Sequence, residues 1–203
     1  MTFIKGIASL AAAMLIGLTA PSAQAGYVMD LTQVGSNVVE TGGGPIDTTG
    51  LTLRGPDCCD LPLLVPSGAQ IVTGPSGSGT STYSGVFSGP LVFGTGGTTF
   101  ASIGSGDPIR FLPTSGELGV PSGYVSGSPL SDTAIYDNQT FMSLGATPGT
   151  YEWTWGTGPN QNLTLVIGTP ESSTWAMMLL GFTGLGFMGY QSAGRRRRTA
   201  CNA

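Results

Sequence analysis

The sequence predicts an all-β protein: an antiparallel, jelly-roll-like β-sandwich body, with an N-terminal signal helix before it and a single C-terminal transmembrane helix after it. Glycine and proline supply 34 and 14 of the 203 residues, which favours short strands joined by tight turns. A hydrophobic content of 40% with a net charge of only −4 argues against disorder. Short apolar runs follow one another at a spacing of roughly 8–15 residues, with no helical period, as in sandwiches and barrels.

The first 25 residues have the three parts of a secretory signal peptide. One basic residue, Lys5, precedes an apolar stretch over residues 6–18, and a small-residue end follows in which Ala23 and Ala25 match the A-x-A cleavage pattern. The apolar stretch is about 20 Å long as a helix, which is short for a bilayer core of about 30 Å. We therefore expect export by the general secretion machinery, with cleavage after Ala25.

The body, residues 26–168, reads as short strands between turn clusters. It holds two basic residues and ten acidic ones, a net charge of −8, which argues against nucleic acid as a partner. The predicted strands are YVMDLTQVGSNVV, LTLR, AQIVTG, YSGVFSGPLVFG, TTFASIG, IRFLP, AIYDNQTFMSLG, TYEWTWG and NLTLVIG.

The strongest local pattern is a hairpin near the end of the body. Tyr151, Trp153 and Trp155 alternate with polar residues, so they line one face of a strand. A turn over GTGPNQ leads to a partner strand that carries Leu163, Leu165 and Ile167 on one face. The three aromatic rings are either part of the core, which we favour, or a candidate platform on which sugar rings stack.

The residue types in the body argue against an enzyme, a cofactor and a metal site. Histidine is absent and the only lysine lies in the predicted leader, which removes His-based nucleophile pairs, His metal ligands and a Schiff-base lysine. Carboxylates remain, and two of them about 5–10 Å apart could act as a glycosidase pair. Most lie near Gly or Pro, where capping of turns explains them. The candidates are Asp57, Asp60, Asp107, Glu117, Asp132, Asp137 and Glu152.

Cys58 and Cys59 are adjacent in the sequence GPDCCDLP. A disulfide is expected outside the cytoplasm where geometry allows it, but neighbouring Cα atoms are only about 3.8 Å apart. Three options follow: a rare vicinal disulfide, links to other chains, or two free thiols.

The C-terminal segment has the length and flanks of a membrane span. Residues 174–193 would form a helix of about 30 Å, with Trp175 and Tyr190 near its two ends. The stretch shows no polar stripe, and four arginines, Arg195, Arg196, Arg197 and Arg198, follow it. Such a basic cluster stays on the cytoplasmic side, so we expect these arginines to stop translocation and residues 199–203 to form a cytoplasmic tail.

Residues 169–198, TPESSTWAMMLLGFTGLGFMGYQSAGRRRR, resemble the PEP-CTERM sorting signal of Gram-negative bacteria. Pro170 and Glu171 match the first two residues of its Pro-Glu-Pro motif, and Ser172 stands where the second proline is usual. The resemblance implies recognition of Pro170 and Glu171 by an exosortase, an integral-membrane cysteine protease or transpeptidase. Similar tails are carried by proteins of bacteria that make extracellular polysaccharide, and by some ice-binding proteins.

These observations predict a non-enzymatic exported protein of the cell surface or extracellular matrix. It would first be held as an inner-membrane-anchored intermediate and then reach the cell envelope or the extracellular space. The alternative is a carbohydrate-binding module of an exopolysaccharide or biofilm matrix, with polysaccharide as its partner. A hydrolase that uses carboxylates alone is the weakest of the three hypotheses.

Overall fold

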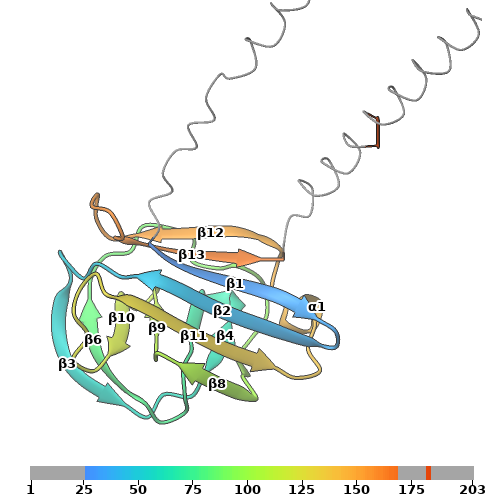
Figure 1. The fold of residues 1–203 in the computed structure, drawn as a ribbon, viewed down its shortest axis with the longest axis horizontal. Coiled ribbons are helices and arrows are strands. Elements are labelled where there is room, and N and C mark those ends of the chain that lie inside the picture. The colour runs from blue at the N-terminus through green and yellow to red at the C-terminus, as the bar shows by residue number, and fades with distance from the viewer. Residues whose placement is uncertain (1–25, 169–181, 184–203) are drawn as a thin grey trace, which may run out of the picture.

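The computed structural model describes residues 26–168 and 182–183. Residues 26–168 form a β-rich body with two sheets that lie against each other (Figure 1). The prediction of a β-rich body built mainly from antiparallel strands is confirmed.

One sheet has six strands in the order β12-β13-β1-β2-β11-β8. Neighbouring strands are antiparallel in this sheet except β1 and β13, which run parallel with Tyr27 opposite Leu163. Among the described strands, this pair is the exception to the predicted antiparallel arrangement. The strands are β1 (Tyr27–Val34), β2 (Asn37–Pro45), β8 (Ile103–Gly106), β11 (Pro129–Tyr136), β12 (Gly149–Thr154) and β13 (Asn162–Ile167).

The other sheet has seven strands in the order β3-β6-β10-β9-β5-β4-β7, all antiparallel to their neighbours. A β-bulge at Arg54 interrupts the pairing of the edge strand β3 with β6. The strands are β3 (Thr52–Cys58), β4 (Leu63–Val65), β5 (Gln70–Val72), β6 (Gly79–Ser84), β7 (Thr99–Phe100), β9 (Arg110–Leu112) and β10 (Glu117–Pro121).

The hydrophobic core lies between the two sheets and draws on both. Side chains alternate between the faces of a strand, so every second residue is buried in β11, in β13 and in β1 as far as Leu31. The largest fully buried side chains come from both sheets and from the connections between them: Tyr27, Met29, Leu31, Ile46, Leu64, Ile71, Phe93, Ile109, Phe111, Leu118, Tyr136 and Trp153.

The predicted hairpin is confirmed as β12 and β13. Tyr151 lies opposite Leu165 and Trp153 opposite Leu163, so the aromatic row and the aliphatic row share one face. That face is the inner one, because Leu163, Leu165 and Trp153 are all fully buried. The hairpin occupies one edge of the six-stranded sheet (Figure 1).

Four of the predicted strands are wrong. The run YVMDLTQVGSNVV turns at Gly35 and Ser36 and forms β1 and the start of β2, and the run TTFASIG is divided between β7 and β8, which lie in different sheets. The run YSGVFSGPLVFG forms strand only at its start, in β6, and continues as a connection that sends Phe87 and Phe93 into the core. The run AIYDNQTFMSLG ends β11 and then forms a short helix, α1 (Phe141–Leu144). Thr140 caps this helix through a capping box with Ser143, a local hydrogen-bond pattern that overrides the apolar content of the run.

The predicted leader and the membrane span at residues 174–193 fall outside the described residues, apart from 182–183. In the part of the chain that is described, no helix has the length and apolar character needed to cross a membrane.

Candidate functional site

The aromatic row of β12 faces the core and not the surface. Trp153 is fully buried and Trp155 is 9% exposed, while Tyr151 is half-buried. The indole of Trp153 donates to the carbonyl of Pro90, and that of Trp155 donates to the carbonyl of Asp47 at 2.7 Å. The core-packing interpretation of the two tryptophans therefore describes the structure, and neither presents a ring face on which a sugar could stack.

Arg110 on β9 is the centre of an ion cluster on the outer face of the seven-stranded sheet. Its Nη1 pairs with Asp57 and lies 3.5 Å from Asp60, and its Nη2 lies 2.6 Å from Glu117. The neighbouring residues Phe111 and Leu118 are fully buried, so by strand alternation Arg110 and Glu117 point outward.

The position of Arg110 in this cluster depends on a glycine in the neighbouring strand β10. In the strand register, Arg110 lies opposite Gly119 of β10. Gly119 lies opposite Thr82 of β6, and Thr82 lies opposite Gly55 of β3. A Cβ at Gly119 would lie 3.0 Å from the Cβ of Arg110, so the absent side chain leaves room for the arginine. Arg110 can then reach a carboxylate on the distant edge strand.

Charge and hydrogen bonds favour the ionised forms of Arg110 and Asp57. Burial alone would lower the pKa of Arg110, but hydrogen bonds to Glu117 and Asp57 outweigh it and raise the pKa. The amide of Cys58 and the Arg110 guanidinium together hold the pKa of the Asp57 carboxyl below its usual range.

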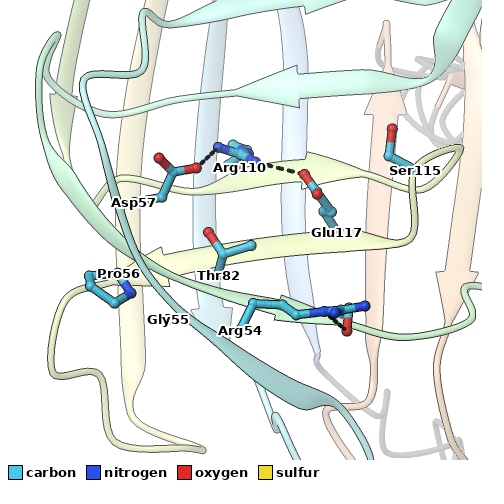
Figure 2. A pocket seen from close by; sticks show the side chains of 9 residues that line it. Arg54, Gly55, Pro56, Asp57, Thr82, Arg110, Ser115 and Glu117 are labelled. Atoms are coloured by element: carbon cyan, nitrogen blue, oxygen red, sulfur yellow. Dashed lines mark hydrogen bonds and ion pairs between the residues drawn. The ribbon is translucent and has the colours of Figure 1, made fainter.

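A polar pocket of about 370 Å³ opens beside the ion cluster (Figure 2). Arg54 enters it from the bulge of β3 and donates from Nε to Ser84 at 2.8 Å. Two buried atoms at this place, Arg110 Nε and Thr82 Oγ1, have no hydrogen-bond partner among the described residues. Its polar lining comes from Arg54, Asp57, Thr82, Ser84, Arg110, Ser115 and Glu117.

A second hollow, of about 250 Å³, lies on the edge hairpin β12–β13. Its polar lining includes Glu152 and Asn162, which are joined by a hydrogen bond of 3.2 Å. Glu152 is the one candidate acid that lines this hollow, so it lies apart from the other candidate acids.

Cys58 and Cys59 form a vicinal disulfide at the end of β3, which was one of the three options left open by the sequence. Cys59 has a left-handed backbone with φ of 72°, and its amide donates to the carbonyl of Ser78 at 3.2 Å. The disulfide lies between Asp57 and Asp60, the two acids of this loop that contact Arg110.

We predict that this disulfide is intact in protein that is purified without a reducing agent. Trypsin can cut after Arg54 and Arg110, and the resulting peptide 55–110 holds both cysteines. Without reduction this peptide should carry no maleimide label and should be 2 Da lighter than its reduced mass. After reduction both thiols should be labelled. A doubly labelled peptide from unreduced protein would show that the two cysteines are free thiols.

A pair of carboxyl groups, Glu40 of β2 and Asp132 of β11, lies inside the core. Glu40 is fully buried and Asp132 is 4% exposed. The hydroxyl of Thr73, directly after β5, donates to Asp132 Oδ2. Both oxygens of Glu40 and the Oδ1 of Asp132 have no hydrogen-bond partner among the described residues. The hydroxyls of Tyr27 and Tyr136 are buried and unpartnered in the same way.

Burial controls the ionisation of this pair. It raises the pKa of Glu40 well above its ordinary value, and the nearby Asp132 raises it further. Burial also raises the pKa of Asp132, against the opposing effect of the hydrogen bond from Thr73. Glu40 and Asp132 therefore stay protonated at pH values at which exposed carboxyl groups are ionised.

The seven acids considered from the sequence are thus divided among several places. Asp57, Asp60 and Glu117 meet at Arg110, and Asp132 is in the core. The carboxylate of Asp107 accepts from the amide of Ser131 on β11, 24 residues further along the chain, which is not the local turn cap that the sequence predicts. The backbone amide of Asp137 donates to the hydroxyl of Ser102 at 3.3 Å. Sequence reasoning did not include Glu40, although its spacing from Val38 places it on the inward face of β2.

The predicted processing residues, namely Ala23, Ala25, Pro170, Glu171 and Arg195 to Arg198, lie outside the described residues. No protein-family model matches this chain, and no curated protein or solved structure shows significant similarity to it.

Proposed function

We propose that this chain is a non-enzymatic exported protein of the cell surface or extracellular matrix, sorted and processed through a PEP-CTERM-type signal. Its partners are then the general secretion machinery, the inner membrane and an exosortase-type membrane protease. The protein passes through an inner-membrane-anchored intermediate on its way to the envelope or the extracellular space.

The observation that supports this proposal is that the first and last strands of the body lie close to the two predicted processing points. Strand β1 begins at Tyr27, directly after the predicted cleavage at Ala25, and β13 ends at Ile167, just before Pro170. The amide of Gly168 still donates to the carbonyl of Leu31, at 2.9 Å. Removal of both end segments would leave every strand of the body in place.

Gly26, the residue after the predicted cleavage, packs closely against β13. This residue is buried, and a Cβ on it would lie 2.0 Å from the Oδ1 of Asn162 on β13. Glycine suits this position with or without the leader, because no side chain fits there.

We also propose that the body belongs to the jelly-roll-like sandwiches. The long-range antiparallel pairing of β2 with β11 supports this, since most of the intervening strands build the opposite sheet. A second candidate function, a carbohydrate-binding module, gains no support from the buried tryptophans, but the polar pocket at Arg110 favours it.

Cell fractionation tests the role of the C-terminal segment. In a Gram-negative cell without an exosortase, the full chain should remain in the inner-membrane fraction. A chain that ends at Thr169 should be released into the periplasm, because the apolar span is missing. A matched variant with Arg195–Arg198 changed to serine should lose stable anchoring. If the full chain is soluble in the periplasm, the sorting proposal is wrong.

A further inference from the structure

The pocket beside Arg110 gathers the basic side chains of an acidic body. Arg54 and Arg110 are the two basic residues between positions 26 and 168, and both line this pocket. Two acids of the lining, Asp57 and Glu117, balance their charge. The lining is therefore neutral as a whole, although it is rich in charged groups (Figure 2).

The pocket offers hydrogen-bond donors and acceptors side by side. Arg54 is exposed, and among the described residues its only hydrogen bond is the one from Nε to Ser84, which leaves its terminal nitrogens available. Glu117 uses Oε2 to bind Arg110, and Oε1 has no hydrogen bond within the described body. The exposed hydroxyl of Ser115 lies at the same place.

The floor of the pocket carries polar groups that the protein itself does not satisfy. Thr82 is 6% exposed, and neither its hydroxyl nor the Nε of Arg110 has a partner among the described residues. Buried polar groups are normally hydrogen-bonded, and leaving one unpaired costs about 1–3 kcal/mol. Both atoms are closed off from solvent, so a ligand would meet the exposed polar residues of the lining, Arg54, Asp57 and Ser115, and not these two atoms.

These features select a class of ligand. A sugar hydroxyl can donate to a carboxylate and accept from a guanidinium at the same time, which matches the alternation of Glu117, Arg110 and Arg54. An anionic ligand would meet Asp57 and Glu117 and a body with a net charge of −8. The lining contains no aromatic or large aliphatic side chain, which excludes a mainly apolar ligand.

We propose that this pocket binds a neutral saccharide through neighbouring hydroxyl groups. Its volume of about 370 Å³ is that of a small-molecule site, at the low end of the usual range of about 300–1,000 Å³. The inference rests on the second candidate function above and does not depend on how the chain is sorted.

Titration of the full chain with oligosaccharides tests the proposal. The chain is purified in a detergent that has no sugar headgroup, and calorimetry compares neutral gluco-, manno- and xylo-oligosaccharides with matching uronic acid oligomers. At least one neutral series should bind with sub-millimolar affinity. Arg54→Met and Ser115→Ala change exposed residues and should each weaken binding, Arg54→Met by about tenfold, since hydrogen bonds to charged groups contribute most.

Glu152→Gln, in the second hollow on the edge hairpin, is the matched control and should bind as the unchanged chain does. The proposal is overturned if none of the neutral oligomers binds, if the uronic acid oligomers bind more tightly, or if Arg54→Met binds normally. Loss of binding in the Glu152→Gln control would also overturn it, because the site would then lie elsewhere. Failure here leaves the sorting proposal intact, since fractionation tests that separately.

Discussion

Replacement of Trp153 by alanine is expected to lower the free energy of unfolding by about 3–5 kcal/mol, the usual cost of removing a large buried aromatic side chain. Trp153 is fully buried and donates a hydrogen bond to Pro90, and its ring packs edge-on against Phe111 from the opposite sheet, with centroids 5.3 Å apart. Its loss would open a cavity between the sheets. Urea unfolding of residues 26–169, followed by circular dichroism, measures the change.

Met142→Ala is the matched control for this prediction. Met142 is 90% exposed, so its truncation should change the free energy of unfolding by no more than about 0.5 kcal/mol. If Trp153→Ala is as mild as Met142→Ala, the tryptophan is not part of the core, and the sugar-platform interpretation of the aromatic row returns.

The second large effect concerns the buried carboxyl pair. Replacement of Glu40 by glutamine should raise the free energy of unfolding at neutral pH and flatten its dependence on pH. The folded body raises the pKa of both Glu40 and Asp132, so it keeps protons that the unfolded chain releases above about pH 4. The contribution of this pair to stability is therefore highest in acid and falls as pH rises toward the folded pKa values, by up to about 1.4 kcal/mol per pH unit for each proton retained.

Glutamine has the shape of glutamic acid and needs no proton to remain neutral, so it removes the contribution of Glu40 to this slope. Unfolding in urea at several pH values between 4.5 and 8 measures it. Asp137→Asn, which changes an exposed acid on the segment after β11, serves as the control and should keep the original slope. An unchanged slope in Glu40→Gln would contradict the assignment of the buried proton to this pair.

Several features of the fold could be predicted from local sequence. The alternation of Tyr151, Trp153 and Trp155 with polar residues predicts the hairpin β12–β13 and its inward face, because strand periodicity is a local property. The glycine and proline content predicts short strands for the same reason. The helix α1 could have been anticipated from the capping box of Thr140 and Ser143, which is a local pattern as well.

The sites depend on contacts that local patterns do not encode. Arg110 meets Asp57 only because β9, β10, β6 and β3 are neighbours in one sheet, and the bulge at Arg54 sets the register of the last pair. Glu40 and Asp132 meet because β2 pairs with β11, some 90 residues further along the chain. The parallel pairing of β1 with β13 likewise joins the two ends of the body.

The most direct test of the account is intact-mass and terminal-peptide mass spectrometry of the mature protein from its own host. The account predicts a chain that starts at Gly26 and ends near Glu171, without the apolar span and the four arginines. A mature surface protein that still ends at Ala203 would contradict processing of the tail, and one that still begins at Met1 would contradict export through a cleaved leader.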